Sequence, residues 1–264
     1  MRVIDVGSGT PLVFVPGLQG RWEYTRATID ALAGHFRVIT FSLCDERSAG
    51  AAFDRARGFD SFGDHVAAAL DSAGIRRAAV CGLSFGGLVA LNFAARYRDR
   101  IGALVLASTP GPGFHLRLRH ELYARLPWIF GPAFMIETPF RAGPEIRRAL
   151  PSARERRAFA WSMLRTALSA PLSLSRMAAR ARMIAGYDIE SVCGQITVPT
   201  LVLTGEPGLD FVVRTDTTSA YTRLIRGAQS VVLADTGHQG SLTRPHAFAA
   251  AIHRFVSEQE HAAA

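Results

Sequence analysis

One serine stands between glycines where an apolar, strand-like run changes into a helix-like one. The stretch is "AAVCGLSFGGLVALNFAARY", from Ala78 to Tyr97, and its second half repeats apolar residues at the spacing of an amphipathic helix. The pattern G-x-S-x-G-G, with Gly82, Gly86 and Gly87, is typical of a nucleophile elbow, a tight turn that exposes a serine oxygen at the edge of a sheet. We therefore predict that Ser84 is a nucleophile. The alternative is a glycine-rich turn in which the serine only caps a helix.

A serine hydroxyl needs an imidazole to accept its proton and a carboxylate to orient that imidazole. In a sheet of this kind the partners follow later strands, in the order serine, acid, histidine. Asp210 follows the apolar run "TLVLTG", in "EPGLDFVV", and His238 follows "SVVLAD", in "TGHQG". We predict these two residues as the partners of Ser84. Glu206, which lies nearer to the end of its strand, is the rival acid.

Acyl transfer also needs hydrogen-bond donors for the oxyanion that develops on the substrate. The backbone N–H of Phe85, directly after the serine, is one candidate. The N–H of Leu18 in "VPGLQG" is the other, because this segment follows a predicted strand beside the serine strand. Alternatively, "PGLQG" is only the turn that ends that strand.

Strand-like and helix-like segments alternate along most of the chain. Continuous apolar runs of strand length lie in "RVIDVG", "PLVFV", "FRVITFSL", "AAVC", "IGALVLAST", "VPTLVLTGE" and "SVVLAD". Helical periodicity occupies the segments between several of them, such as "WEYTRATIDALAGH" and "RPHAFAAAIHRFV". This alternation predicts an α/β fold with a mostly parallel sheet and helices on both faces.

The alternation stops between residues 111 and 194, where helical patterns broken by prolines replace the strands. We predict a core of residues 1–110 and 195–264, and a helical cap of residues 111–194 over the carboxyl edge of the sheet. The large apolar residues of this segment are expected either to line a pocket under the cap or to pack it onto the core. They are Trp128, Phe130, Phe134, Met135, Phe140, Trp161, Met163 and Met177.

Composition limits the classes of protein. A chain of 264 residues with 48% hydrophobic residues suits one α/β domain with an insertion. No apolar segment is long enough to span a membrane, and no apolar signal region opens the chain, so we expect a cytoplasmic location without membrane insertion. Cys44, Cys81 and Cys193 are too widely spaced for a disulfide framework or a zinc site, and no residue cluster predicts a metal or another cofactor.

The charge is strongly positive. The net charge is +8, and all 30 basic residues are arginines. No zinc-finger, helix-turn-helix or basic–aromatic pattern accompanies them, so we do not expect nucleic-acid binding. Solvated helix faces explain most of this charge, and attraction to anionic ligands or membrane surfaces stays open.

With these residues in view, the chain resembles the capped α/β-hydrolase family. The resemblance rests on "PLVFVPGLQG", "VCGLSFGGLVALNFAARY", "PTLVLTGEPGLDFVV" and "ADTGHQGSLTRPHAFAAAIHRF". It implies an eight-stranded, mostly parallel sheet, a cap at about residues 110 to 195, and a triad of Ser84, Asp210 and His238 that needs no cofactor. Two positions depart from the family pattern, because Pro16 and Leu83 stand where histidine is common.

The resemblance implies a serine hydrolase that cleaves a small or medium apolar carboxylic ester through an acyl-enzyme. Alternatives on the same triad are hydrolysis of a carbon–carbon bond, lactone hydrolysis and acyl transfer, and a non-catalytic ligand receptor is a different class. The chemistry of related dehalogenases and epoxide hydrolases is excluded, because their nucleophile is aspartate and residue 84 is serine. The oligomeric state is left open.

Overall fold

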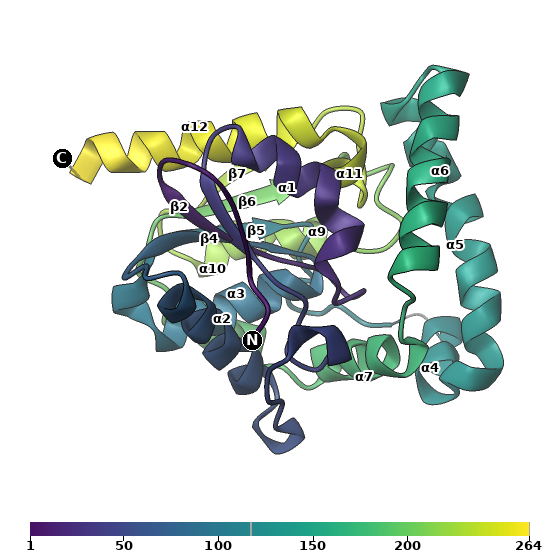
Figure 1. Ribbon diagram of the computed structural model, residues 1–264, viewed down its shortest axis with the longest axis horizontal. Helices are drawn as coiled ribbons and strands as arrows, with labels where there is room; N and C mark the ends of the chain where they lie inside the picture. Colours follow the sequence, from purple (N-terminus) through teal and green to yellow (C-terminus); the bar gives the residue numbers. More distant parts are fainter. Residues whose placement is uncertain (117, 264) are drawn as a thin grey trace.

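A seven-stranded, mostly parallel sheet forms the centre of the molecule (Figure 1). The computed structural model describes residues 1–116 and 118–263, without the side chains of Phe134 and Ala263. The strands are β1 (Ile4–Gly7), β2 (Pro11–Val15), β3 (Arg37–Thr40), β4 (Ala78–Leu83), β5 (Ile101–Ala107), β6 (Thr200–Thr204) and β7 (Gln229–Val232). Their spatial order is β1-β3-β2-β4-β5-β6-β7, and only the β1–β3 pair is antiparallel. The predicted fold class is confirmed.

The sheet has seven strands, whereas the resemblance implies eight. Each of the seven apolar runs in the sequence forms one strand, and no eighth strand occurs among the described residues. Further apolar runs, such as residues 88–95 and 247–252, lie in helices α3 and α12 and so supply no eighth strand.

Helices cover both faces of the sheet. Those before β6 are α1 (Arg26–Ala33), α2 (Phe59–Ser72), α3 (Phe85–Arg96), α4 (Leu118–Arg125), α5 (Pro127–Ala149), α6 (Ala153–Ser169), α7 (Leu174–Ala185) and α8 (Ile189–Cys193). Those after β6 are α9 (Thr215–Ser219), α10 (Tyr221–Leu224), α11 (Gly240–Thr243) and α12 (Pro245–Ala263). Single 3-10 turns are η1 (Trp22–Thr25), η2 (Arg47–Ala49), η3 (Arg55–Arg57) and η4 (Arg98–Arg100).

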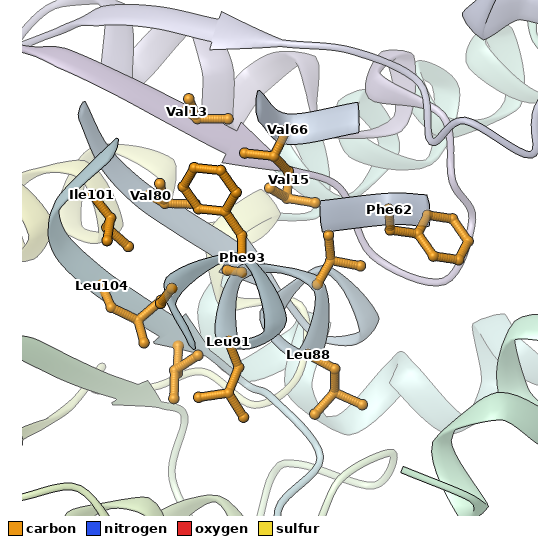
Figure 2. Close-up of a cluster of buried hydrophobic side chains, with 14 of the residues drawn as sticks. Val13, Val15, Phe62, Val66, Val80, Leu88, Leu91, Phe93, Ile101 and Leu104 are labelled. Atoms are coloured by element: carbon orange, nitrogen blue, oxygen red, sulfur yellow. The ribbon is translucent and has the colours of Figure 1, made fainter. Parts of the chain in front are cut away.

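Strand β2 shows why the core has two layers. Its side chains alternate between the two faces of the sheet, as in any strand. Val13 and Val15 pack with α2 and α3 on one face, in the cluster drawn in Figure 2. Leu12 and Phe14 pack with α1 and α12 on the other. Because both faces are covered, the central strands are apolar along their whole length.

Five helices, α4 to α8, fill the chain between β5 and β6, and no strand occurs among the described residues there. Helices α4, α5 and α6 stand at one end of the molecule, away from the C-terminus (Figure 1). The prolines do divide the segment, but Pro132, Pro139 and Pro144 lie inside α5, which continues through them. We call residues 111–194 the cap segment. That the cap segment is a unit separate from the core stays a prediction, because its last helix, α8, packs directly against α3 of the core.

Candidate active site

Ser84 lies between the end of β4 and the start of α3, in a strained backbone conformation. Its φ of 54° is in the left-handed region that residues with a Cβ atom rarely adopt. The glycines around it are required by close packing. A Cβ on Gly82 would collide with the Gly86 backbone, one on Gly86 with the Val15 carbonyl, and one on Gly87 with Thr109. The turn therefore has the geometry of a nucleophile elbow.

His238 and Asp210 meet although they lie 28 residues apart. His238 follows β7 and Asp210 follows β6, and the imidazole Nδ1 is 3.2 Å from the Asp210 Oδ2. The second carboxylate oxygen of Asp210 accepts hydrogen bonds from the N–H groups of Val212 and Val213, at 2.9 and 2.8 Å. Backbone bonds thus hold the carboxylate, and the carboxylate holds the ring.

The loop that carries His238 fits closely against the loop that carries Asp210. A Cβ on Gly237 would collide with the backbone of Leu209, so only glycine permits this approach. The requirement explains the glycine that directly precedes the histidine.

The electrostatic surroundings of His238 favour its protonated form. Burial by itself would lower the pKa of the imidazole. The Asp210 carboxylate, through its charge and its hydrogen bond, and the nearby Glu145 outweigh that effect and hold the pKa above its ordinary value. The ring is thereby suited to receive a proton.

Ser84 and His238 open onto one cavity of about 180 Å³ beneath the cap segment. Most of the lining is apolar and comes from the cap segment and from the loop after β6. The core and loop contribute Leu18, Phe85, Pro110, Phe211, Val212 and Val213, and the cap segment contributes Phe114, Leu116, Leu174, Met177, Ala181 and Ile184, among others. The described structure thus brings the predicted serine and histidine to one apolar space.

The two predicted oxyanion donors also lie at this cavity. Phe85 is the first residue of α3, where a backbone N–H has no acceptor within the helix. The turn that carries Leu18 lies against Ser84, since a Cβ on Gly17 would be 3.5 Å from the Ser84 Cβ. Both N–H groups are therefore on segments that adjoin the serine, and their role stays a prediction.

Glu206 forms its hydrogen bonds with backbone groups and not with His238. Its Oε1 accepts a hydrogen bond from the backbone N–H of Asp235 at 2.8 Å, and its own N–H donates to the Thr236 carbonyl. These bonds shape the loop that leads to His238, whereas Asp210 contacts the imidazole itself. The geometry therefore favours Asp210 over Glu206 as the partner of the histidine.

Glu145 is a residue of the site that sequence reasoning missed. It projects from α5, is 2% exposed and lines the cavity. Its Oε1 accepts a 2.6 Å hydrogen bond from the backbone N–H of Gln239, next to His238. Burial raises the pKa of Glu145 to about 7. A single glutamate in a helix gives no spacing signal, so only the fold could identify it.

Arg180 was missed for the same reason. This arginine of α7 is fully buried and bridges the Asp45 and Glu46 carboxylates, at 2.7 and 2.5 Å. Its Nη1 also donates to the Leu18 carbonyl at 2.8 Å. The guanidinium therefore fixes the turn that presents the Leu18 N–H, and it fastens the cap segment to the core.

We expect the substitution Arg180→Met to lower the free energy of unfolding by about 3–5 kcal/mol, because it leaves the nearly buried Asp45 carboxylate without a counter-charge and Glu46 with Arg176 alone. Urea denaturation measures the change. Arg176→Met is the matched control, since this arginine bonds the same Glu46 but is 29% exposed. Its expected cost is below about 1 kcal/mol. Equal costs for the two variants would contradict the role given to Arg180.

Most of the large apolar residues that were candidates for the pocket lining do not line the cavity. Of the eight large apolar residues named from the sequence, only Met177 lines the cavity among those described, and the side chain of Phe134 lies outside the described residues. Trp128, Phe140 and Trp161 are 78%, 79% and 59% exposed. The expectation is wrong for these three residues, because the cap helices turn smaller residues toward the cavity, such as Gly131 of α5 and Ala181 of α7.

Metal binding and membrane spanning are two further properties that the described residues bear on. Within the described residues, no group of three or more His, Cys, Asp or Glu side chains could hold a metal ion. None of the helices in the described part of the chain is long and apolar enough to cross a membrane.

Comparison with known proteins places these features in a family. A family model for the alpha/beta hydrolase fold matches residues 10–245. The 2-hydroxy-6-oxo-2,4-heptadienoate hydrolase of Pseudomonas putida is 34% identical over 120 residues, which are 42% of this chain and 42% of that protein. The chain thus matches less than half the length of this curated relative.

Solved structures match almost the whole chain. An esterase from Thermogutta terrifontis is 26% identical with a TM-score of 0.76, covering 98% of this chain and 93% of its own. The enol-lactonase of Burkholderia xenovorans is 22% identical with a TM-score of 0.75, covering 97% and 96%. At that identity the second likeness concerns the fold alone.

Proposed function

The chain belongs to the alpha/beta hydrolase family, and from this premise we propose that it hydrolyses small or medium apolar carboxylic esters with Ser84 as nucleophile. One observation carries the proposal. The strained Ser84 turn and the Asp210-bonded His238 open onto the same apolar cavity. A cavity of this kind takes an apolar acyl or alkoxy group and offers it a nucleophile and a base.

The first half of the reaction acylates the serine. The His238 Nε2 accepts the Ser84 hydroxyl proton as Oγ attacks the acyl carbon, and a tetrahedral intermediate forms. Asp210 fixes the ring through Nδ1 and stabilises the imidazolium. The imidazolium then gives its proton to the alkoxy oxygen, the carbon–oxygen bond breaks and the alcohol leaves.

The second half releases the acid. Water attacks the acyl carbon, His238 takes its proton, and Ser84 regains a proton as the acyl–oxygen bond breaks. In both halves the N–H groups of Leu18 and Phe85 stabilise the oxyanion. The Arg180 bond to the Leu18 carbonyl restrains the peptide group that directly follows the Leu18 N–H.

Steady-state hydrolysis of a series of nitrophenyl esters of increasing acyl length tests the proposal. We expect multiple turnovers with an optimum at short or medium acyl groups, because the cavity is only about 180 Å³. A folded protein that turns over no ester of the series would contradict ester hydrolysis.

A second candidate reaction on the same residues is hydrolysis of a carbon–carbon bond. It is favoured by the relative from Pseudomonas putida, whose name states a hydrolase of 2-hydroxy-6-oxo-2,4-heptadienoate. Analysis of the products formed from that compound separates the two reactions. Cleavage of it at a rate well above that of any ester would make carbon–carbon hydrolysis the main activity.

Turnover is expected to depend on the protonation of His238. The imidazole must be neutral to accept the serine proton, and its pKa is held above the ordinary value, so kcat/KM should fall as the pH drops through that raised pKa. Glu145, whose pKa is about 7, is partly ionised near neutral pH, and Glu145→Gln removes this negative charge, which favours the imidazolium. The acid limb of the kcat/KM profile of this variant should therefore lie at lower pH than that of the native protein. A pH profile of kcat/KM measures the shift.

Glu137→Gln is the matched control for this profile. Glu137 also lies on α5, but it pairs with Arg119 and does not line the cavity. Its acid limb should stay in place. An unchanged profile in Glu145→Gln, or a shift to higher pH, would refute the effect given to Glu145.

A further inference from the structure

Helix α5 has a face that lines the cavity and an opposite face that exposes large apolar side chains. One face lines the cavity, through Pro127, Gly131, Ala142 and Glu145 among others. The opposite face, by helical spacing and exposure, carries Trp128, Ile129, Ile136 and Phe140, each between 67% and 79% exposed. A monomeric protein rarely exposes so many large apolar side chains together, and such a patch marks an interaction site.

Helix α6, which follows α5 after three residues, has no buried residue among those described. Its exposed apolar residues Trp161, Leu164 and Leu168 repeat at the spacing of one helix face. By the same spacing, Arg154, Arg157 and Arg165 lie on this face. The Arg165 guanidinium carbon is 6.0 Å from the centre of the Trp161 ring, which confirms that these two side chains are neighbours.

The charged side chains on this face of α6 are all arginines, so the charge of the face is positive. Within the part of the chain that the structure describes, Arg154, Arg157 and Arg165 form no ion pair. The one acid of α6, Glu155, caps the start of its own helix through Ser152. The face thus combines apolar side chains with positive charges that no acid neutralises.

We propose that the arginine-containing face of α6, together with the exposed apolar residues of α5, the helix before it, docks the protein on an anionic lipid surface. Tryptophan, isoleucine, leucine and phenylalanine side chains bury themselves at the boundary of headgroups and acyl chains. Arginines extend from such a surface to anionic headgroups and add electrostatic attraction. Docking of this kind is peripheral and needs no spanning helix.

The positive charge and the apolar side chains favour a lipid surface over two other occupants, a second copy of this chain and a nucleic acid. A second copy joined by two-fold symmetry would bring the same face against itself, and the arginines of both copies would gather without an acid. A nucleic acid would accept the arginines, but it offers no apolar layer for Ile129, Ile136 and Leu168. A lipid surface with anionic headgroups satisfies both features.

The docking face has a consequence for the cavity, because α5 forms the wall between them. The outer and cavity-lining faces belong to the same helix, so a docked cap segment would hold the cavity one helix away from the lipid. An apolar ligand dissolved in that lipid would be close to the cavity when it leaves the bilayer.

Co-sedimentation with lipid vesicles tests the docking directly. The whole purified chain is mixed with vesicles of phosphatidylcholine alone, or of phosphatidylcholine with about one third phosphatidylglycerol. We expect binding to the anionic vesicles that weakens with added salt. The double substitution Arg157→Glu/Arg165→Glu on α6 should weaken it about tenfold or more. Trp128→Ala/Phe140→Ala on α5 should weaken it about tenfold too, because both side chains lose apolar burial.

Arg98→Glu/Arg226→Glu is the matched control, since it reverses two exposed arginines of the core. It should retain most of the binding. Thermal unfolding of each variant shows that it is folded, so the test does not depend on ester turnover.

Three results would overturn the proposal. They are absence of binding to anionic vesicles, binding that neither variant on α5 or α6 weakens, and equal weakening by the core control. A dimer that the same variants dissociate, without vesicle binding, would assign the face to a second copy. Retention of nucleic acid by the face, again without vesicle binding, would assign it to that partner.

Discussion

Replacing Ser84 by alanine is expected to lower ester turnover by about 10⁴- to 10⁶-fold, because no other group in the reaction forms the acyl-enzyme. The fold should be unaffected. Alanine, like serine, carries a Cβ atom, so the strain at a φ of 54° is the same in both proteins. Steady-state kinetics of the variant, beside its thermal unfolding curve, measures the two effects separately.

Ser108→Ala is the matched control. Ser108 follows β5, the strand next to β4, and also has a positive φ, of 44°, but it does not line the cavity. The same substitution in a similar backbone should leave turnover nearly unchanged. Turnover that persists in Ser84→Ala would refute serine catalysis, and equal losses in both variants would indicate damage to the sheet edge.

The substitution Asp210→Asn is expected to lower kcat by about 10⁴-fold. The amide of asparagine can donate to the imidazole, which then presents the wrong nitrogen to the serine, and it lacks the charge that stabilises the imidazolium. The hydrogen bond at stake is the 3.2 Å contact between the Asp210 Oδ2 and the His238 Nδ1. Single-turnover kinetics would show whether acylation itself has slowed.

Glu206→Gln decides between the two acids named from the sequence. A glutamine can still accept the hydrogen bond from the Asp235 N–H, so the loop that leads to His238 keeps its support. Turnover should therefore stay within about tenfold of the native value. If Glu206→Gln abolished turnover and Asp210→Asn did not, the assignment of the acid would be reversed.

Much of this arrangement could be predicted from residue patterns. Seven apolar runs became seven strands, and the helical segments between them became helices on two faces. Ser84, Asp210 and His238 each follow a strand of a parallel sheet, whose carboxyl ends meet at one edge. The pairing of Asp210 with His238 follows from that rule, although the two residues are far apart in the chain.

The outward aromatics of the cap segment could not be predicted in this way. The largest described apolar residues of α5 lie on its exposed face, whereas the cavity face carries small and polar residues such as Gly131 and Glu145, so apolar periodicity does not indicate the face that meets the cavity. Glu145 and Arg180 were likewise invisible, because their partners lie 94 and more than 130 residues away in sequence.

The sequence by itself determined the order of strands and helices along the chain, the glycines of the serine turn and the edge of the sheet where the predicted site residues lie. These depend on local backbone preferences and on the handedness of βαβ connections, which short patterns encode. Tertiary structure alone decided which cap residues enclose the cavity and which remain exposed. Those outcomes depend on packing between segments distant in the chain, and such contacts leave no periodic signal in either segment.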